Sequence, residues 1–314
     1  CQEQRIIRLL RLPATLSSRA VLLLPVDYQG DIIRPPSEAF SLILQATTGC
    51  SHNRCTFCGA YRDKPFAVKP WSQIEADLDF AVAWCGRHTT LFLADGDALG
   101  LPDELLTALL NRIREKLPWI RRVSSYASCQ NIQDKTDQQL AHYKSLGLSR
   151  LYMGLESGHD PTLAAVAKGV DSEAMIVAGQ RIRAAGIFLS VTCLLGIAGA
   201  ECSQQHALAT AAALNRMQPH QIAVLTLMVL PNTPLYRQMR AGRFALPDQA
   251  QLFLELRSLL RSLEPFRTQF HANHASNYFS LSGRLPRDRD QMSSTIDQAL
   301  AGLVPLKPEP RRAL

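Results

Sequence analysis

Short apolar runs alternate with stretches of helical periodicity along most of the chain. Six of these runs have the apolar character of buried strands, namely Ser41–Ala46, Thr90–Ala94, Arg121–Tyr126, Arg150–Leu155, Phe188–Leu195 and Ile222–Val229. Between them, apolar residues recur at helical spacing in Trp71–Cys85, Asp103–Lys116, Lys135–Ser145, Ser172–Ala185 and Ser203–Met217. Strands that alternate with helices predict an α/β fold with right-handed crossovers. We therefore expect a partial (β/α)6 TIM-like barrel of parallel strands with a C-terminal helical extension.

The pattern changes on both sides of this predicted core at residues 41–230. Residues 1–40 are expected to form an N-terminal extension that includes a strand at Val21–Pro25. Residues 231–314 are expected to form a C-terminal extension of helices and loops that closes the barrel. Its predicted segments are a helix at Gln249–Leu263, an irregular polar segment at Phe266–Leu285 and a final helix at Gln291–Leu303.

Composition describes an ordinary globular protein, because 46% of the residues are hydrophobic and 19% are charged. The net charge of +7 is spread along the chain and no basic and aromatic stripe accompanies it. A solvated surface explains this charge better than a nucleic-acid partner does. No apolar run is long enough for a membrane span. The chain begins at Cys1 with no visible signal peptide, so we expect a truncated cytoplasmic chain, with a lipid-modified Cys1 as the alternative.

Three of the eight cysteines gather in one loop after the first predicted strand, at Cys50, Cys55 and Cys58. Thiolates suit zinc or iron–sulfur clusters, and a structural zinc site normally needs four ligands. His52 is the candidate for a fourth zinc ligand, but no second cysteine pair follows elsewhere. An iron–sulfur cluster on three cysteines would instead leave one iron free for a substrate or a cofactor. The missing fourth cysteine is therefore itself a functional signal.

The loop resembles the signature of the radical S-adenosylmethionine (SAM) superfamily. In that family three cysteines hold a [4Fe–4S] cluster, and the amino and carboxylate groups of SAM chelate the open iron. The resemblance implies that Cys50, Cys55 and Cys58 are the cluster ligands and that Phe57 lies near the adenine. The family usually spaces its cysteines by three and then two residues, whereas this loop has four and then two. The longer spacing leaves open which bond of SAM is cleaved.

Further polar residues follow the later strands in an order that fits the same family. The stretch Asp95, Gly96 and Asp97 imperfectly resembles the segment that binds the SAM amino group, and without the cysteine loop a simple Asp-Gly turn would be the favoured interpretation. Glu156 and Ser157 follow the fourth strand, where the family places polar residues that bind the ribose.

Lys168, before Gly169, matches a basic position that pairs with the SAM carboxylate. The alternatives are a charge that favours a helix N-terminus for Glu156 and a solvated lysine for Lys168. The resemblance also implies contacts around the ribose and adenine from the third, fifth and sixth strand ends, at Ser125, Thr192 and Met228.

Two histidines stand in the predicted polar segment near the C-terminus. His271 and His274 could bind a metal or act as acid and base, and the alternative is a hydrogen-bonded loop that closes the barrel. We hypothesise that this segment faces the substrate cavity.

The resemblance implies a reaction and its partners. The reduced cluster would cleave SAM to methionine and a 5′-deoxyadenosyl radical, which removes hydrogen from an unidentified, small-molecule substrate. Such an enzyme would be oxygen-sensitive and would need a low-potential electron donor such as flavodoxin or ferredoxin. Two alternatives stay open, a non-catalytic haem or iron–sulfur carrier on the same fold and a zinc-stabilised binding protein.

Overall fold

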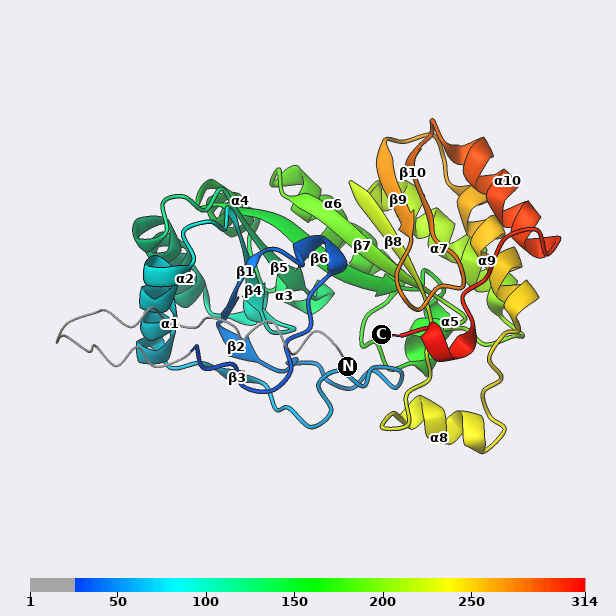
Figure 1. Cartoon of the computed structure of the whole chain (residues 1–314), viewed down its shortest axis with the longest axis horizontal. Coiled ribbons are helices and arrows are strands. Elements are labelled where there is room, and N and C mark those ends of the chain that lie inside the picture. Colours follow the sequence, from blue (N-terminus) through cyan, green and yellow to red (C-terminus); the bar gives the residue numbers. More distant parts are fainter. Residues whose placement is uncertain (1–25, 314) are drawn as a thin grey trace, which may run out of the picture.

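The computed structural model describes residues 26–313, which fold around one sheet with the strand order β1-β4-β5-β6-β7-β8-β9-β10 (Figure 1). These strands are β1 (Leu42–Gln45), β4 (Thr90–Ala94), β5 (Arg122–Ala127), β6 (Leu148–Glu156), β7 (Phe188–Leu195), β8 (Gln221–Thr226), β9 (Thr268–Ala272) and β10 (Leu281–Leu285). Neighbouring strands are parallel from β1 to β9, and β10 is antiparallel to β9. The predicted α/β fold with a mostly parallel sheet is confirmed.

Helices cover one face of the sheet and connect its parallel strands. The longer ones are α1 (Trp71–Trp84), α2 (Asp103–Lys116), α4 (Asp137–Ser145), α6 (Ser172–Ala184), α7 (Ser203–Met217), α9 (Gln249–Ser262) and α10 (Arg289–Leu300). The shorter elements are α3 (Cys129–Gln133), α5 (Asp160–Ala165), α8 (Pro234–Arg240), β2 (Thr47–Thr48), β3 (Ala67–Val68) and the 3-10 turns η2 (Pro36–Glu38), η3 (Ala98–Gly100) and η4 (Glu309–Arg311). Among residues 26–313, no helix combines the length and apolar character needed to cross a bilayer.

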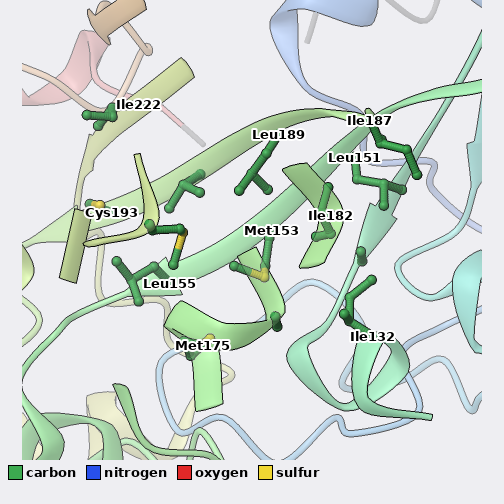
Figure 2. Close-up of a cluster of buried hydrophobic side chains, with 14 of the residues drawn as sticks. Ile132, Leu151, Met153, Leu155, Met175, Ile182, Ile187, Leu189, Cys193 and Ile222 are labelled. Carbon is green, nitrogen blue, oxygen red and sulfur yellow. The ribbon is translucent and has the colours of Figure 1, made fainter. Parts of the chain in front are cut away.

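Alternate residues of each strand face the helices and form the main core. Figure 2 shows Leu151, Met153 and Leu155 of β6 gathered with Met175 and Ile182 of α6 in one apolar cluster. Successive side chains of a strand point to opposite faces, so the residues between them face the other, concave side of the sheet. This concave face is where the polar residues of the predicted site are expected.

Aromatic rings from β4, β5 and β6 occupy part of the concave face. Phe92, Tyr126 and Tyr152 pack edge to face, with ring centroids 5.3 to 6.3 Å apart. Beneath them, the Tyr152 hydroxyl donates to the buried carboxylate of Glu38 at 2.5 Å, which Arg122 also pairs at 3.1 Å. Packed side chains therefore fill this part of the concave face, and in such folds the chemistry is expected at the carboxyl ends of the strands.

The prediction of an irregular segment at Phe266–Leu285 is wrong, because this segment contains β9 and β10. In β9, buried residues alternate with the more exposed Gln269 and His271, so the strand lacks the apolar run by which a buried strand is found. The C-terminal part therefore adds two strands to the sheet. Among the described residues β1 and β10 remain the two edges, and the sheet does not close into a barrel. The predicted strand at Val21–Pro25 lies outside the described residues.

Candidate functional site

The cysteine loop follows β1 at the carboxyl end of the sheet. Figure 1 shows α8 at the same lower edge of the molecule as β2 and β3, which flank the loop. The chain around α8 is tied to the loop, since Leu235 N donates to Thr56 O at 2.9 Å and Asn232 Nδ2 to Gly59 O at 3.1 Å. The loop is thus held between the ends of strands that are distant in sequence.

The three cysteines of the loop are free and half-buried. Burial raises the pKa of Cys55 to about 11, with a smaller lowering by Lys168 and a smaller raising by Glu156. Burial likewise raises the pKa of Cys58. Other cysteines of the loop raise the pKa of both thiols further. Direct bonds agree with this proximity, because Thr56 N donates to Val166 O at 2.9 Å and so ties the cysteine loop to the segment that leads to Lys168.

Each of the first three residues between Cys50 and Cys55 is tied to a different part of the fold. Ser51 donates from its backbone N–H to Asp97 Oδ2 at 3.1 Å, and its hydroxyl bonds the same oxygen. The Nε2 atom of His52 bonds the carbonyl of Ala167 at 2.8 Å. Asn53 adopts a φ of 36°, and its Nδ2 donates to Tyr61 O at 2.7 Å. The longer loop is therefore held in a defined conformation by hydrogen bonds, and the left-handed backbone at Asn53 accommodates its extra length.

Arg62 binds the carbonyl groups of the loop from one side. Its Nε donates to Cys58 O at 3.0 Å, its Nη2 donates to Cys55 O, and its Nη1 reaches Asn53 O at 3.5 Å. A guanidinium offers several donors in a fixed plane, so one side chain can hold three carbonyls in a defined arrangement. Sequence reasoning missed this residue, because nothing in the spacing distinguishes it from other surface arginines.

The stretch after β4 connects the cysteine loop to the sheet. The Asp95 Oδ2 atom pairs with Lys64 Nζ at 2.5 Å and accepts from Gly49 N at 3.2 Å. A Cβ atom on Gly96 would stand 2.5 Å from the ring of Tyr61, so only glycine allows this close packing. Asp95 and Asp97 are buried, and each has an Oδ1 atom with no hydrogen-bond partner among the described residues.

Glu156 and Lys168 form an ion pair above Gly154. The Lys168 Nζ atom lies 3.1 Å from Glu156 Oε1, and a Cβ on Gly154 would collide with that carboxylate. Burial lowers the pKa of Lys168, but Glu156 and the neighbouring cysteines raise it, and the net shift is upward. Thr192 pairs with Gly154 in the sheet, and Ala223 and His271 continue the same row across β8 and β9. The concave face thus presents a charged pair beside the cysteine loop.

An apolar patch adjoins this pair. Phe57 packs against a cluster that includes Leu194 and Ile197 from the end of β7 and Leu227 after β8. Met228 follows in the same segment and is half-buried. Apolar side chains beside a few polar groups are typical of small-molecule binding sites.

Comparison with protein families identifies the group to which the chain belongs. The model of the Radical SAM superfamily matches residues 44–200, which is half of the chain and includes the cysteine loop, Glu156 and Lys168. The chain belongs to the radical SAM superfamily. Proteins of this superfamily bind a [4Fe–4S] cluster and SAM.

Two curated relatives match part of this radical SAM chain. The haem chaperone HemW of Bacillus subtilis (strain 168) is 27% identical over 182 residues, which cover 57% of this chain and 47% of HemW. The 4′-phospho-dehydrooxetanocin synthase of Priestia megaterium is 26% identical over 172 residues, covering 48% of this chain and 23% of the synthase. The chain thus spans less than half the length of these relatives.

Solved structures show the same fold at low sequence identity. Coproporphyrinogen III oxidase (HemN) from Escherichia coli, a radical SAM enzyme, superposes with a TM-score of 0.51 at 18% identity, covering 70% of this chain and 50% of HemN. The radical SAM methyltransferase TsrM from Kitasatospora setae gives a TM-score of 0.53 at 15% identity, covering 65% of this chain and 39% of TsrM. At this identity the likeness establishes the fold.

The residues of this radical SAM chain fit both the [4Fe–4S] cluster and SAM. Three thiols from one loop suit a cluster that keeps one iron without a protein ligand. Among residues 26–313, no three His, Cys, Asp or Glu side chains lie close enough together to enclose a single metal ion. A [4Fe–4S] cluster takes each thiolate on a different iron, so its ligands stand farther apart than those of zinc. The unpartnered Oδ1 of Asp97 is an acceptor that the ammonium group of SAM can use.

Two of the predicted contacts do not face the concave side. Ser125 lies between Val123 and Ala127, which pack in the helix-covered core, and its hydroxyl donates to Tyr126 O at 3.0 Å. Ser157 is fully buried, and its Oγ lies 2.7 Å from His206 Nδ1 of α7. Both hydroxyls are therefore engaged inside the protein.

The two predicted catalytic histidines lie on and after β9. His271 projects from the concave row, with its Nδ1 atom 3.2 Å from Ser282 Oγ on β10. The Nδ1 of His274 accepts from Ser276 N at 3.1 Å, and the buried Ser276 in turn bonds the end of β8 through Thr226 N. Burial lowers the pKa of both histidines. His271 is thus in the concave row, whereas His274 lies in the segment that follows β9, and the predicted role of both remains a prediction.

We expect Arg62→Ala to lower the amount of iron that the reconstituted protein retains during gel filtration. Each charge-assisted hydrogen bond contributes about 1.5–3 kcal/mol, and this variant removes the donors that hold the carbonyls of Cys55 and Cys58. Arg54→Ala is the matched control, because Arg54 belongs to the same loop but is exposed and makes no side-chain hydrogen bond among the described residues. Equal iron retention by both variants would contradict the role of Arg62.

Proposed function

We propose that this chain is a radical SAM enzyme that cleaves SAM reductively and abstracts hydrogen from a small-molecule substrate. One observation carries the proposal: the cysteine loop is bonded to the segment just before Lys168, through Thr56 N to Val166 O at 2.9 Å and His52 Nε2 to Ala167 O at 2.8 Å, and Lys168 pairs with Glu156. The residues expected to bind SAM are therefore beside the thiols expected to bind the cluster. A zinc-stabilised or purely structural domain gives no reason for this arrangement.

Different residues of the chain would hold the cluster, SAM and the substrate. When bound, the reduced cluster supplies one electron, which splits SAM into methionine and a 5′-deoxyadenosyl radical that takes hydrogen from the substrate. Cys50, Cys55 and Cys58 would hold the cluster. Lys168 would pair with the SAM carboxylate and Glu156 would accept from the ribose hydroxyls. Both residues would keep the nucleoside in a fixed orientation, and the row at Thr192 and His271 would border the substrate.

Detection of 5′-deoxyadenosine tests the proposal. The protein would be purified without oxygen, reconstituted with iron and sulfide, reduced with dithionite and incubated with SAM. We expect 5′-deoxyadenosine from the reduced protein and none from the same protein left oxidised. A brown protein that binds SAM but never cleaves it, with dithionite or with reduced flavodoxin or ferredoxin as donor, would contradict the proposed activity. A colourless protein that takes up no iron would contradict the cluster itself.

A haem carrier is the second candidate function, and the similarity to the haem chaperone HemW of Bacillus subtilis favours it. A carrier would bind haem in one stable complex and would not need to turn over SAM. Haem titration followed by visible absorption, with SAM cleavage measured in parallel, separates the two functions. Stoichiometric haem binding without 5′-deoxyadenosine would favour the carrier.

Replacing His271 and His274 together by Ala is expected to abolish turnover of the substrate while the visible spectrum of the cluster stays unchanged. The reason is that His271 belongs to the concave row and His274 follows the same strand, and burial lowers the pKa of both, which keeps them neutral and able to accept a proton near pH 7. Until a substrate is known, cleavage of SAM and cluster absorption can be measured on the double variant. Loss of the cluster would indicate instead that the two histidines are structural.

A further inference from the structure

A buried network of hydrogen bonds and polar contacts connects the ends of β6 and β7 to helix α9. Ser157, directly after β6, has its Oγ 2.7 Å from His206 Nδ1 on α7. The Nε2 atom of His206 lies 3.4 Å from Glu255 Oε1 on α9. The same carboxylate accepts from Gly196 N, directly after β7, at 2.8 Å and from the Ser203 hydroxyl. The His206 and Glu255 side chains are 2% and 0% exposed, so water does not compete for these bonds.

The donors and acceptors of this network assign the protons. Ser157 Oγ already accepts from His159 N at 2.9 Å, so its own hydrogen is free to go to His206 Nδ1. This arrangement fits a His206 tautomer with its ring proton on Nε2, which faces Glu255 Oε1 at 3.4 Å. The Glu255 carboxylate receives hydrogen bonds from Gly196 N and the Ser203 hydroxyl, one on each oxygen, and His206 adds a longer polar contact. A carboxylate suits this position, because an amide in its place would offer only one acceptor oxygen.

The network stands next to an irregularity in the pairing of β6 with β7. Gly154 pairs with Thr192 but Glu156 pairs with Cys193, so β6 has one residue more than β7 over this step. Such a bulge redirects the side chains that follow it. Glu156 has a φ of 61°, which is unfavourable for a side chain that large, and its carboxylate lies beside Lys168. Surrounding bonds must hold this conformation, and the bonds of Ser157 come immediately after it.

We propose that the buried network Ser157–His206–Glu255 positions Glu156 and the β7 end for SAM, and that Ser157 acts through this network rather than by touching the ribose. The inference rests on the proposed function, since it concerns the same site. It assigns a role in that site to Glu255, a residue outside the region that matches the family model. Ser157, His206 and Glu255 are thus positioning residues, and Glu156 is the group they present.

The affinity for SAM of the reconstituted, oxidised protein tests this proposal, because the oxidised cluster does not cleave the ligand. Isothermal titration would compare wild type, Glu255→Gln, Ser157→Ala and the double variant, with iron content and melting temperature measured on each. We expect each single variant to weaken SAM binding about tenfold, which corresponds to the loss of one hydrogen bond to a charged group. We expect the double variant to be no weaker than the poorer single variant, because both changes break one network.

Ser258→Ala is the matched control, since Ser258 lies on the same helix and bonds Gln204 on the exposed side. Additive effects in the double variant, or an unchanged affinity for SAM in Glu255→Gln, would overturn the proposal. Should Glu255→Gln fail to fold, Ser157→Ala and His206→Gln form the same cycle with smaller changes. A wild-type protein that holds its cluster but binds no SAM would overturn the proposed function and this inference together, whereas an effect of Ser157→Ala alone would overturn only the inference.

Discussion

Cys58→Ser is expected to remove the cluster and, with it, all formation of 5′-deoxyadenosine. Serine keeps the size and the backbone of the loop, and the Cys58 carbonyl can still accept from Arg62. What is lost is the soft thiolate, which an iron–sulfur cluster requires and which an alcohol does not replace at neutral pH. Two thiols would remain for a cluster that needs three. Iron per chain, the brown absorption of the reconstituted protein and 5′-deoxyadenosine by chromatography measure the outcome.

Cys202→Ser is the control for this experiment. Cys202 is also a free, half-buried cysteine, but it lies just before α7 and far from the loop in sequence. We expect the control to retain iron and SAM cleavage at the wild-type level. Loss of iron in both variants would point to general damage of the fold. Full iron content in Cys58→Ser would show that Cys58 is not a cluster ligand.

The core of the fold could be predicted because its strands are buried on both faces. The runs at Thr90–Ala94 and Phe188–Leu195 coincide with β4 and β7, since continuous apolar character marks a strand inside a helix-covered sheet. The strand β9 escaped prediction for the opposite reason. It lies near the sheet edge and alternates buried with more exposed residues over only five positions, a pattern that a polar loop also produces.

The site could be predicted only as far as its residues lie close to strand ends in sequence. Glu156 and Lys168 belong to one loop region, and the structure pairs them. Ser157 was expected beside Glu156 on the ligand side, but successive side chains of a strand point to opposite faces, and the Ser157 hydroxyl bonds His206 inside the protein. The partners His206 and Glu255 are 49 and 59 residues from the groups they bind, and only tertiary packing brings them together.

The second large effect is expected for Lys168→Met, which should weaken SAM binding about 10-fold to 100-fold and leave the iron content unchanged. Lys168 is the cation that lies beside both Glu156 and the thiols, and a charge-assisted bond to a carboxylate contributes about 1.5–3 kcal/mol. Methionine keeps the length and apolar stem of the side chain and removes only the charge. Lys168→Arg should recover part of the affinity, because it restores a cation at the same place.

Lys116→Met is a closely matched control for this variant. The Lys116 Nζ atom pairs with Glu75 at 2.6 Å and with Asp79 at 2.5 Å, and its side chain is 14% exposed, against 17% for Lys168. Both variants therefore remove a mostly buried lysine that is paired with carboxylates, but Lys116 lies on α2 and away from the cysteine loop. Weaker SAM binding confined to Lys168→Met would assign the effect to the site. Equal affinity in Lys168→Met and wild type would mean that another cation pairs with the SAM carboxylate. It would also show that the Glu156–Lys168 pair does not contribute to SAM binding.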